Sequence, residues 1–385
     1  MSSLTSAEKV LAAFEKRKTG RIAVFHAGFS SAAASVPLGR EAYVGGGINQ
    51  WREAVALWNG PDAHAEYLDR CKRDAYDLTR AANCDIIRAS YWRMNEKPTQ
   101  RLDEYTFLYG DPGGDYTVRR LDPETEMYQV ADKRDSKAPQ TVEDLEAQVV
   151  EMEEGLETFQ PGPGHFEKEL DALAAFDYKR AVFTGGYWLC IPNRDELWLQ
   201  AVALRPDLVE RLLEVQCVQS LRIIEAAKDL PLRYCSGGGD FCGKNGPNYS
   251  PRVFHEMMVP RLKRMSDLAH KLGKFTIFAT DGNVWPVAKD LFDTAGTDAF
   301  HEIDRRAGMD HWRLRREHPR LTCMGNISSL TVHRGTKEEV IAECRDNAEA
   351  ALQLGGVIPG LSNQAVKGSP PENIIALVET LAEYQ

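Results

Sequence analysis

The strongest constraint on the fold of this 385-residue chain is a regular alternation of short apolar runs with longer segments of helical periodicity. Between the runs, segments such as 206–228 and 337–354 carry apolar residues at three- and four-residue spacing, which is typical of amphipathic helices. Strands that alternate with helices form a parallel sheet, and eight such strands close a barrel. The apolar runs cover residues 21–26, 84–90, 180–184, 232–235, 275–279, 298–303, 321–324 and 356–359. We therefore predict an α/β fold, a (β/α)8 TIM barrel that occupies residues 1–385 as one domain.

Two segments depart from this alternation. The first 20 residues have helical spacing with charged residues throughout, and they predict an N-terminal helix before the first strand. Residues 105–133 alternate polar with apolar residues around the turn sequence Asp111-Pro-Gly-Gly-Asp115. This pattern predicts a β-hairpin insertion after the second strand, where it would form a lid or rim of the barrel.

Charge and composition exclude several classes of function. The formal net charge is -10 and there is no long basic run, so we expect no nucleic-acid-binding surface. No stretch reaches the roughly 18 uninterrupted apolar residues of a membrane span, and the charged start does not resemble a signal peptide. The eight cysteines form no CxxC pair, which favours reduced, mostly buried thiols over disulfides. We therefore expect a cytoplasmic protein that acts on a small molecule.

Polar residues follow the predicted strands, at the end of a barrel where active sites form. Because the carboxyl ends of parallel strands meet at one face, these side chains are expected to line one pocket. Candidate catalytic residues are Tyr187, Asp240, Asp281 and His301. Candidate substrate-binding residues are His26, Arg88, Tyr91, Asn326 and Asn363.

Asp281 is the strongest of these candidates. It follows the run 275–279, and Gly282 permits a sharp turn that aims the carboxylate inward as a general base or a metal ligand. The alternative is that Asp281 caps the next helix, since Asp is a favoured N-cap residue. His301 and Glu302 end the neighbouring strand, close enough for Asp281, His301 and Glu302 to share one ion. A satisfied structural histidine is the alternative for His301.

The segment from Cys235 to Cys242 contains three consecutive glycines before Asp240. Backbone N–H groups of such a turn can cradle an anion, and glycines let the backbone approach a ligand closely. A zinc pair is conceivable for the two cysteines, but their spacing is unusual and buried thiols are favoured. Four aromatic residues fall where a pocket would form, with core packing as the equal alternative: Tyr91, Trp92, Tyr187 and Trp188.

Seven segments follow one another along the chain in an order and spacing that are together specific. They are Ser6-Ala-Glu-Lys-Val-Leu-Ala-Ala-Phe-Glu15, Gly239-Asp-Phe-Cys-Gly-Lys-Asn-Gly-Pro-Asn-Tyr-Ser-Pro251, Thr280-Asp-Gly-Asn283, Ala307-Gly-Met-Asp310, Gly325-Asn-Ile327, Gly335-Thr-Lys-Glu-Glu-Val340 and Pro371-Glu-Asn373. These segments resemble the uroporphyrinogen decarboxylase-like superfamily nearly end to end. The resemblance implies a (β/α)8 barrel that acts as a porphyrinogen decarboxylase or as a corrinoid-dependent methyltransferase.

The chain departs from two branches of this superfamily. Porphyrinogen decarboxylases carry an Arg-Gln-x-Gly-Arg stretch after the first strand, where this chain has Phe25-His-Ala-Gly28. Zinc-dependent methyltransferases carry His-x-Cys after the fifth strand, where this chain has Ala279-Thr-Asp281. The resemblance to other methyltransferases implies oxygen and histidine ligands instead, which Asp281, His301 and Glu302 would supply.

The resemblance therefore implies methyl transfer from a small methylated substrate to a corrinoid. The corrinoid would be carried by a partner protein, since no corrinoid-binding segment is recognisable in this chain. A zinc or similar ion on Asp281, His301 and Glu302 would act as Lewis acid, with Asp240 or Tyr187 orienting substrate or relaying a proton. The same resemblance implies a homodimer.

Two alternatives stay open. The first is a metal-independent decarboxylase or lyase, in which Arg88 or Lys244 holds a carboxylate and Asp281 protonates the carbanion. The second is a barrel that only binds a ligand or partner, without catalysis.

Overall fold

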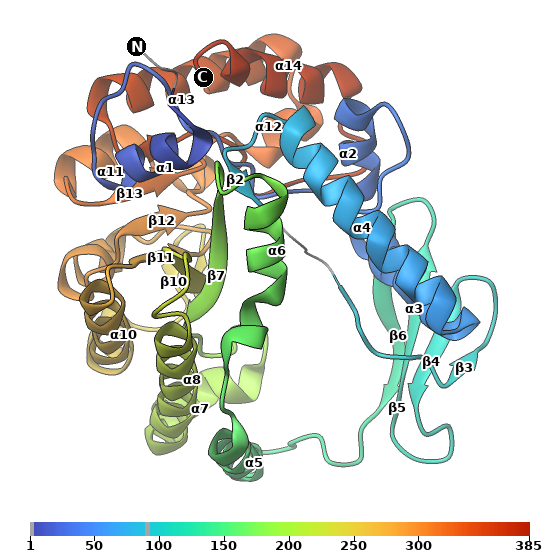
Figure 1. The fold of residues 1–385 in the computed structure, drawn as a ribbon. Coiled ribbons are helices and arrows are strands. Elements are labelled where there is room, and N and C mark those ends of the chain that lie inside the picture. Colours follow the sequence, from blue (N-terminus) through green and yellow to red (C-terminus); the bar gives the residue numbers. More distant parts are fainter. Residues whose placement is uncertain (1–3, 89–92) are drawn as a thin grey trace.

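Parallel strands in one curved sheet form the barrel wall (Figure 1). The computed structural model describes residues 4–88 and 93–385. In spatial order the strands are β14 (Val357–Ile358), β13 (Thr322–Met324), β12 (Ala299–His301), β11 (Phe275–Ala279), β8 (Tyr234–Gly238), β7 (Ala181–Trp188) and β2 (Ile86–Ile87). Every neighbouring pair in this order is parallel. The predicted α/β barrel fold is confirmed, and these seven strands overlap seven of the eight predicted runs.

The remaining predicted run is the first along the chain, residues 21–26. It lies between the two edges of the sheet without forming a regular strand. Its Phe25 N–H donates to Pro359 O, next to β14, over 3.0 Å. On the other side, Asp85 N–H, next to β2, donates to Val24 O over 2.8 Å. The regular ladder is interrupted because the side chain of Asp85 accepts the Val24 N–H. The segment thus joins both edges, and the barrel is closed.

Helices cover the outside of the sheet, as the apolar spacing predicts. The longer ones are α1 (Ser6–Phe14), α2 (Ser31–Leu38), α3 (Gly47–Asn59), α4 (Pro61–Ala81), α5 (Leu145–Thr158), α6 (Glu167–Ala175), α7 (Glu196–Leu204), α8 (Pro206–Ala226), α10 (Val259–Lys271), α11 (His311–Glu317), α12 (Ser329–Arg334), α13 (Lys337–Leu354) and α14 (Pro371–Ala382). A short helix α9 (Pro251–Val253) precedes α10. None of the helices in the described ranges is both long and apolar enough to cross a membrane.

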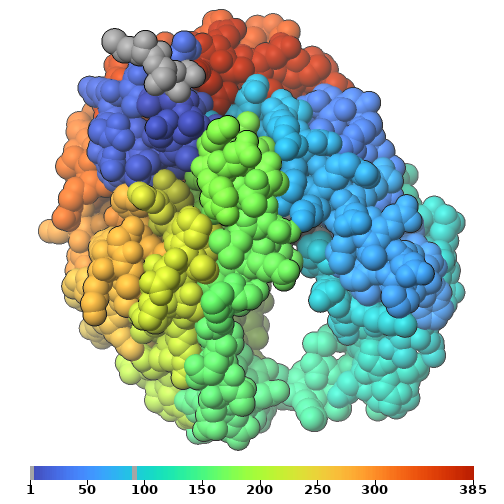
Figure 2. Space-filling model, viewed as in Figure 1, coloured from blue at the N-terminus to red at the C-terminus, as the bar shows by residue number. Residues whose placement is uncertain are grey.

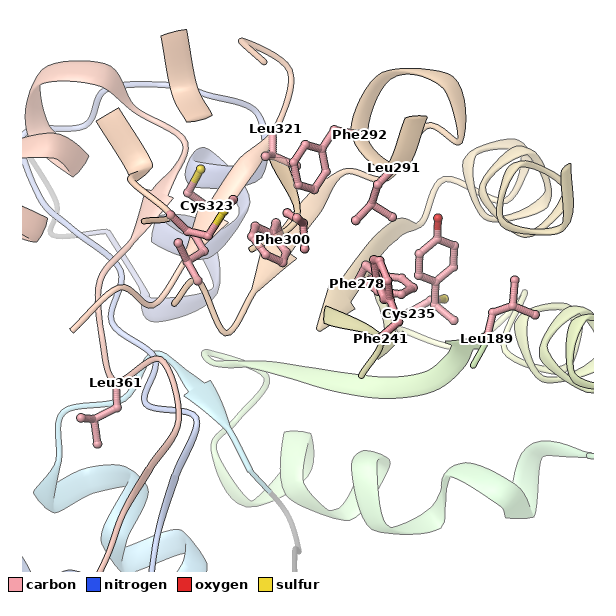
Figure 3. Packing of buried hydrophobic residues seen from close by; sticks show 14 of the residues in the cluster. Leu189, Cys235, Phe241, Phe278, Leu291, Phe292, Phe300, Leu321, Cys323 and Leu361 are labelled. Atoms are coloured by element: carbon pink, nitrogen blue, oxygen red, sulfur yellow. The ribbon is translucent and has the colours of Figure 1, made fainter. Parts of the chain in front are cut away.

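Alternation along the strands separates an inner core from an outer one. Helix α1 packs against the inner core, and the centroid of the Phe14 ring lies 4.7 Å from that of Tyr234 and 5.0 Å from that of Phe275. Outward-facing side chains such as Phe278 and Phe300 pack in the layer between sheet and helices (Figure 3). The prediction of free, mostly buried thiols is confirmed, because all eight cysteines are free and five of them are buried.

The insertion after β2 forms more structure than the single predicted hairpin. Its four antiparallel strands are β3 (Gln100–Arg101), β4 (Thr106–Gly110), β5 (Tyr116–Asp122) and β6 (Met127–Arg134). Helix α3 buries its apolar face against this accessory sheet. The Lys367 Nζ atom, in the loop after β15 (Gln364–Ala365), donates to Pro123 O over 2.7 Å and so ties the sheet to the barrel. Figure 2 shows an opening between the accessory sheet and the segment that contains α5 and α6.

Candidate active site

The inner face of the barrel ends in a layer of side chains at the carboxyl ends of the strands. The strand registers place Trp188 beside Gly238, Gly238 beside Ala279, and Ala279 beside His301. His301 follows the inward-facing Ala299 by two residues, so its ring also points into the barrel. Two small residues therefore occupy the middle of this layer, between an indole and an imidazole.

Three carboxylates converge directly above this layer. Asp240 follows β8, Asp281 follows β11 and Glu302 follows β12, and one oxygen of each lies within 4.8 Å of the others. The three strands are neighbours in the sheet, so their ends bring together residues that are far apart in sequence. The Asn363 amide, in the loop after β14, donates to Asp281 Oδ2 over 2.8 Å. We call Asp240, Asp281 and Glu302 the acidic triad.

Local backbone geometry aims the triad. Gly282 has a φ of +85°, and a Cβ there would lie 2.6 Å from Cys242 O, so this turn requires glycine. Asn283, not Asp281, accepts the N–H of Trp285 with its side chain. The capping alternative for Asp281 is therefore wrong, because its carboxylate faces Asn363 and the other two acids.

Burial and like charge set the protonation of the triad. The pKa of Asp281 rises to about 6 because the group is buried and lies near Asp240 and Asp304, while the hydrogen bond from Asn363 opposes the shift. The pKa of Glu302 rises to about 8 through burial and the charges of Asp281 and Asp240, against the opposing charge of Arg88. At neutral pH the protonated Glu302 therefore lies beside the ionised Asp281, and a cation bound there would favour the ionised forms.

His301 lies beneath the triad rather than within it. Its side chain is 6% exposed, and Nε2 has no hydrogen-bond partner among residues 4–88 and 93–385. Burial, reinforced by Arg88, lowers the pKa of His301 to about 3, so the imidazole is neutral at physiological pH. Of the predicted metal set, Asp281 and Glu302 come together, and the third member of the cluster is Asp240 in place of His301.

Tyr187 is displaced from its predicted catalytic position. The side chain is fully buried outside the barrel wall, and its hydroxyl lies 2.8 Å from Ser266 Oγ and 2.9 Å from Thr297 Oγ1. The register of β7 shifts between Thr184 and Tyr187, and this bulge reverses the alternation that the sequence implies. Tyr187 is a packing residue, and Trp188 takes the inward position.

Other predicted substrate-binding residues hold loops together. Asn326 donates to Met309 O over 3.1 Å and lies 2.7 Å from His311 Nδ1, so its amide is used within the fold. His26 accepts the Leu361 N–H at Nδ1 over 3.2 Å, and it is 3% exposed, behind the barrel wall. Asn363 stays in the site, where it binds Asp281 rather than standing free for substrate.

Arg88 directly follows β2 and stays at the mouth, where its charge acts on both His301 and Glu302. Its Nη1 atom lies 3.7 Å from the position that a Cβ would take at Gly28. Tyr91 and Trp92 lie outside the described residues.

The glycine-rich segment was predicted to cradle an anion, but the structure gives another reason for its glycines. A Cβ at Gly237 would lie 2.3 Å from Tyr187 O, and one at Gly238 would lie 2.0 Å from Ala279 O. These glycines let β8 approach both neighbouring strands, so they serve the barrel rather than a ligand. The strand consequently runs on to Gly238, past the predicted end at residue 235. This extension brings Asp240 into the triad. The sequence predicted a catalytic role for Asp240 but did not predict that it would bind an ion.

The donor set tests whether a zinc ion fits. Zinc in proteins favours thiolate and imidazole ligands, whereas the triad offers carboxylate oxygens only. Cys242 and the buried His301 are not part of the cluster found among the described residues. The triad therefore fits a divalent ion that prefers oxygen ligands, such as Mg²⁺ or Mn²⁺, better than zinc.

Comparison with known proteins supports the resemblance seen in the sequence. A family model described as uroporphyrinogen decarboxylase (URO-D) matches residues 241–384, in the C-terminal part of the chain. A search of curated proteins finds no match. The solved structure of a methyltransferase from Methanosarcina mazei is similar over 99% of both chains, with 16% identity and a TM-score of 0.60. A D-psicose 3-epimerase structure aligns over 55% of this chain and 79% of its own, at 11% identity and a TM-score of 0.32. The first likeness shows the shared fold, and the second supports no conclusion.

Proposed function

We propose that this protein transfers a methyl group from a small methylated substrate to a corrinoid carried by a partner protein. The observation that carries the proposal is the convergence of Asp240, Asp281 and Glu302 at the mouth of the barrel. A methyl group leaves a heteroatom readily only when positive charge compensates the electrons that remain behind. Three carboxylates within 4.8 Å of one another are suited to hold such a charge beside the leaving atom. The methyltransferase fold shared with the Methanosarcina mazei protein agrees with this reaction.

The residues of this chain bind and orient the substrate. Asn363 fixes one oxygen of Asp281, so the carboxylate keeps its direction when a substrate enters. Glu302 is protonated at neutral pH because its pKa is raised to about 8, and it can give a proton to a heteroatom that departs as an anion. His301 presents a neutral imidazole from below.

In the metal-assisted form of the proposal, Asp240, Asp281 and Glu302 hold a divalent ion. Bound there, the ion would supply Lewis acidity to the leaving heteroatom. Elemental analysis of untagged wild-type protein, Asp281→Ala and His301→Ala tests this form. We expect Asp281→Ala to lose the ion and His301→Ala to retain it, because His301 lies outside the cluster. Wild-type protein that neither contains a divalent ion nor takes one up from solution would exclude metal assistance.

The direct test uses free cob(I)alamin in place of the partner-bound corrinoid. Protein and methylated compounds are mixed anaerobically, and the loss of the cob(I)alamin absorption band is followed. We expect a protein-dependent loss with at least one substrate class, and a loss about 10²–10³-fold slower with Asp281→Asn. No transfer from ammonium, sulfonium, ether or thioether compounds would contradict the proposal. We also propose a cytoplasmic homodimer, for which light scattering of the purified protein should give twice the mass of the 43.1 kDa chain.

A second candidate, a metal-independent decarboxylase or lyase, is favoured by one observation. The protonated Glu302 lies within the electrostatic reach of Arg88, so a proton donor and a carboxylate-binding cation are neighbours. Such a pair can hold a substrate carboxylate and protonate the carbanion that remains after CO2 is lost. Lys244, the other predicted carboxylate-binding residue, is exposed on the turn between β9 (Cys242–Gly243) and β10 (Gly246–Pro247). Enzyme-dependent CO2 release from small carboxylates, abolished in Glu302→Gln, would favour this candidate over methyl transfer.

A further inference from the structure

Trp188 is exposed at a position where the barrel interior begins. Its side chain is 52% exposed, whereas its neighbours Tyr187 and Leu189 are both fully buried in the outer core. Successive residues of an extended strand point to opposite faces, so Trp188 points inward where its neighbours point outward. Because Trp188 pairs with Gly238, no side chain from β8 covers the indole at that level. An aromatic face therefore borders the mouth of the barrel.

The indole and the acidic triad belong to adjoining strand ends. The end of β7 packs against the turn that leads to Asp240, and Cys190 Sγ lies 3.6 Å from Asp240 O. A Cβ at Gly239 would lie 2.7 Å from Leu189 O, which shows how closely these two segments approach. An aromatic face and clustered carboxylates are the two features that bind organic cations.

A third feature lies beneath them. The His301 ring points into the barrel, is 94% buried and has an Nε2 atom without a partner in the described parts of the chain. A buried polar atom without a hydrogen-bond partner costs free energy. Such atoms are therefore nearly always satisfied by the protein, by water or by a ligand. The Nε2 atom therefore retains one unused hydrogen-bonding capacity, which a polar substituent of a bound molecule would satisfy.

We propose that the methylated substrate is a small quaternary ammonium compound with one polar substituent, its cationic head between Trp188 and the acidic triad and its substituent at His301. This inference rests on the proposed methyl transfer and names its substrate class. A quaternary ammonium group has no N–H to donate, so it is bound by charge and by aromatic faces rather than by hydrogen bonds. The carboxylates then face the substrate's own positive charge, and a metal ion is not needed to balance them.

The same charge makes the reaction balance. The C–N bond breaks and its electron pair stays on nitrogen, so that the ammonium cation leaves as a neutral tertiary amine. The methyl group forms its new bond with an electron pair from the reduced corrinoid of the partner. No proton is transferred, and no other oxidant or reductant takes part.

Calorimetry on EDTA-treated protein tests the inference by binding alone. The probes are choline, tetramethylammonium and 3,3-dimethyl-1-butanol, which has the shape of choline with carbon in place of the charged nitrogen. We expect choline to bind at least tenfold more tightly than the uncharged analogue. Trp188→Leu should weaken choline binding about tenfold, since a desolvated cation–π contact is worth roughly 1–2 kcal/mol. Trp188→Phe should restore part of this affinity.

Matched variants separate the three contacts. Trp58→Leu, at a half-exposed indole on α3, should leave choline binding unchanged. His301→Leu should weaken choline but not tetramethylammonium, which has no substituent to meet the imidazole. Asp240→Asn should weaken both cations. The variants are compared only if their circular dichroism and melting temperatures match those of wild type.

The outcomes distinguish this inference from the proposed function. Equal binding of choline and its uncharged analogue would overturn the inference, as would stoichiometric Mn²⁺ that choline cannot displace. Methyl transfer to cob(I)alamin from an ether but from no ammonium compound would also overturn it, while the methyltransferase proposal would stand. Cation binding with the expected variant pattern but without methyl transfer would support the site and contradict the methyltransferase proposal.

Discussion

Carboxylates gather in two regions of this protein. In one they are paired with arginine, and in the other they face one another. Between α3 and α4, the fully buried Glu53 accepts hydrogen bonds from Arg93 Nε over 2.7 Å and from the Met94 N–H over 2.8 Å. Burial alone would raise the pKa of Glu53, but the bonds from Arg93, His64 and Met94 lower it below its ordinary value. At the barrel mouth, burial and neighbouring acids raise the pKa values of Asp281 and Glu302.

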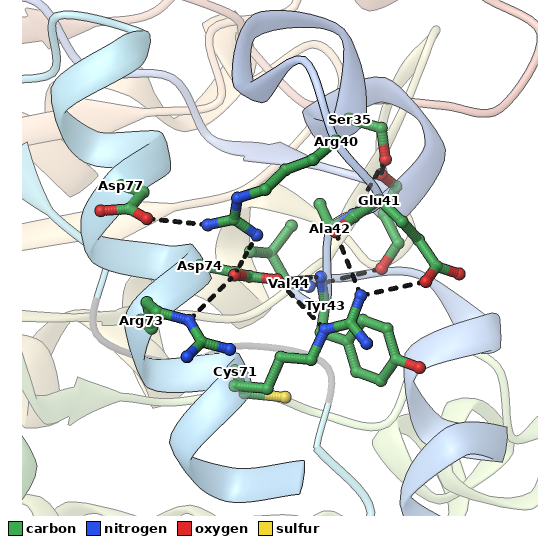
Figure 4. Close-up of polar contacts among 12 residues, drawn as sticks. Ser35, Arg40, Glu41, Ala42, Tyr43, Val44, Cys71, Arg73, Asp74 and Asp77 are labelled. Carbon is green, nitrogen blue, oxygen red and sulfur yellow. Dashed lines mark hydrogen bonds and ion pairs between the residues drawn. The ribbon is translucent and has the colours of Figure 1, made fainter. Parts of the chain in front are cut away.

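Asp74, on α4, repeats the first arrangement (Figure 4). Its buried carboxylate accepts from Arg40 Nη1 over 2.5 Å and from the Tyr43 N–H over 2.8 Å. Arg40 also reaches Asp77 on the same helix. These contacts fasten the loop between α2 and α3 to α4. A buried acid paired with arginine stabilises the fold, whereas acids that face one another keep a charge uncompensated for a ligand.

The largest expected effect on stability is at Glu53, the buried acid that is paired with arginine. Glu53→Ala leaves Arg93 without its carboxylate, and Arg93 is only 21% exposed. We expect the free energy of unfolding to fall by about 3–5 kcal/mol, as when one member of a buried ion pair is removed. Urea unfolding measures this loss, with the exposed Glu154→Ala as control at under about 0.5 kcal/mol. A loss below about 1 kcal/mol for Glu53→Ala would show that this pair does not stabilise the fold.

The matching change at the mouth should affect activity rather than stability. Asp281→Asn keeps the shape of the side chain but removes one of the facing charges. We expect methyl transfer to slow by about 10²–10³-fold, as when one preorganised electrostatic group is lost. The free energy of unfolding should stay unchanged or rise, because repulsion with Asp240 and Glu302 is relieved. If Asp281→Asn destabilised the protein as Glu53→Ala is expected to, the contrast between the two regions would fail.

A smaller effect is expected at Asp74. Asp74→Ala leaves the Tyr43 N–H without its acceptor and should cost about 1–3 kcal/mol of unfolding free energy. Arg40→Ala should cost less, about 0–1 kcal/mol, because Arg40 is 39% exposed and its ion pairs are screened by water. Thermal and urea unfolding of the two variants check this order. An equal or larger loss for Arg40→Ala would mean that the ion pair matters more than the backbone bond.

The free energy of unfolding should also depend on pH, with a sign set by Glu302. Its pKa in the folded protein, about 8, lies above the ordinary 4.5, so between these values the folded state holds more protons than the unfolded state. This contribution is fully present below pH 4.5 and is lost as pH rises through 8. The slope is at most about 1.4 kcal/mol per pH unit for one group. Unfolding measured from pH 5 to 9 should show a flatter slope for Glu302→Gln than for wild type.

The sequence predicted the fold more completely than it predicted the site. Eight apolar runs between helical segments predicted the barrel, because strand alternation and helical spacing are local properties of the chain. Residues 21–26 were identified as barrel wall but not as an irregular segment, since the Asp85 side chain that interrupts its ladder comes from the next strand. The accessory sheet exceeded the predicted hairpin because Thr99–Arg101 pair with β4 only in three dimensions.

Within the site, position after a strand was a good guide and orientation was not. Asp240, Asp281, Glu302 and Asn363 were identified because each follows a strand whose end faces the mouth. Tyr187 was misplaced because the bulge before it reverses which face its side chain occupies. No local signal in the sequence distinguishes a glycine pair that forms a bulge from one that approaches a ligand.

The sequence by itself determined that this chain folds as an α/β barrel, that acids and histidines follow its strands, and that it resembles the uroporphyrinogen decarboxylase-like superfamily. Only the tertiary structure decided that Asp240 completes the acidic triad, that His301 lies beneath it, and that Trp188 faces the mouth. The physical reason is that periodicity depends on near neighbours in the chain. The distance between charges depends on strands β8, β11 and β12, which become neighbours only when the sheet forms.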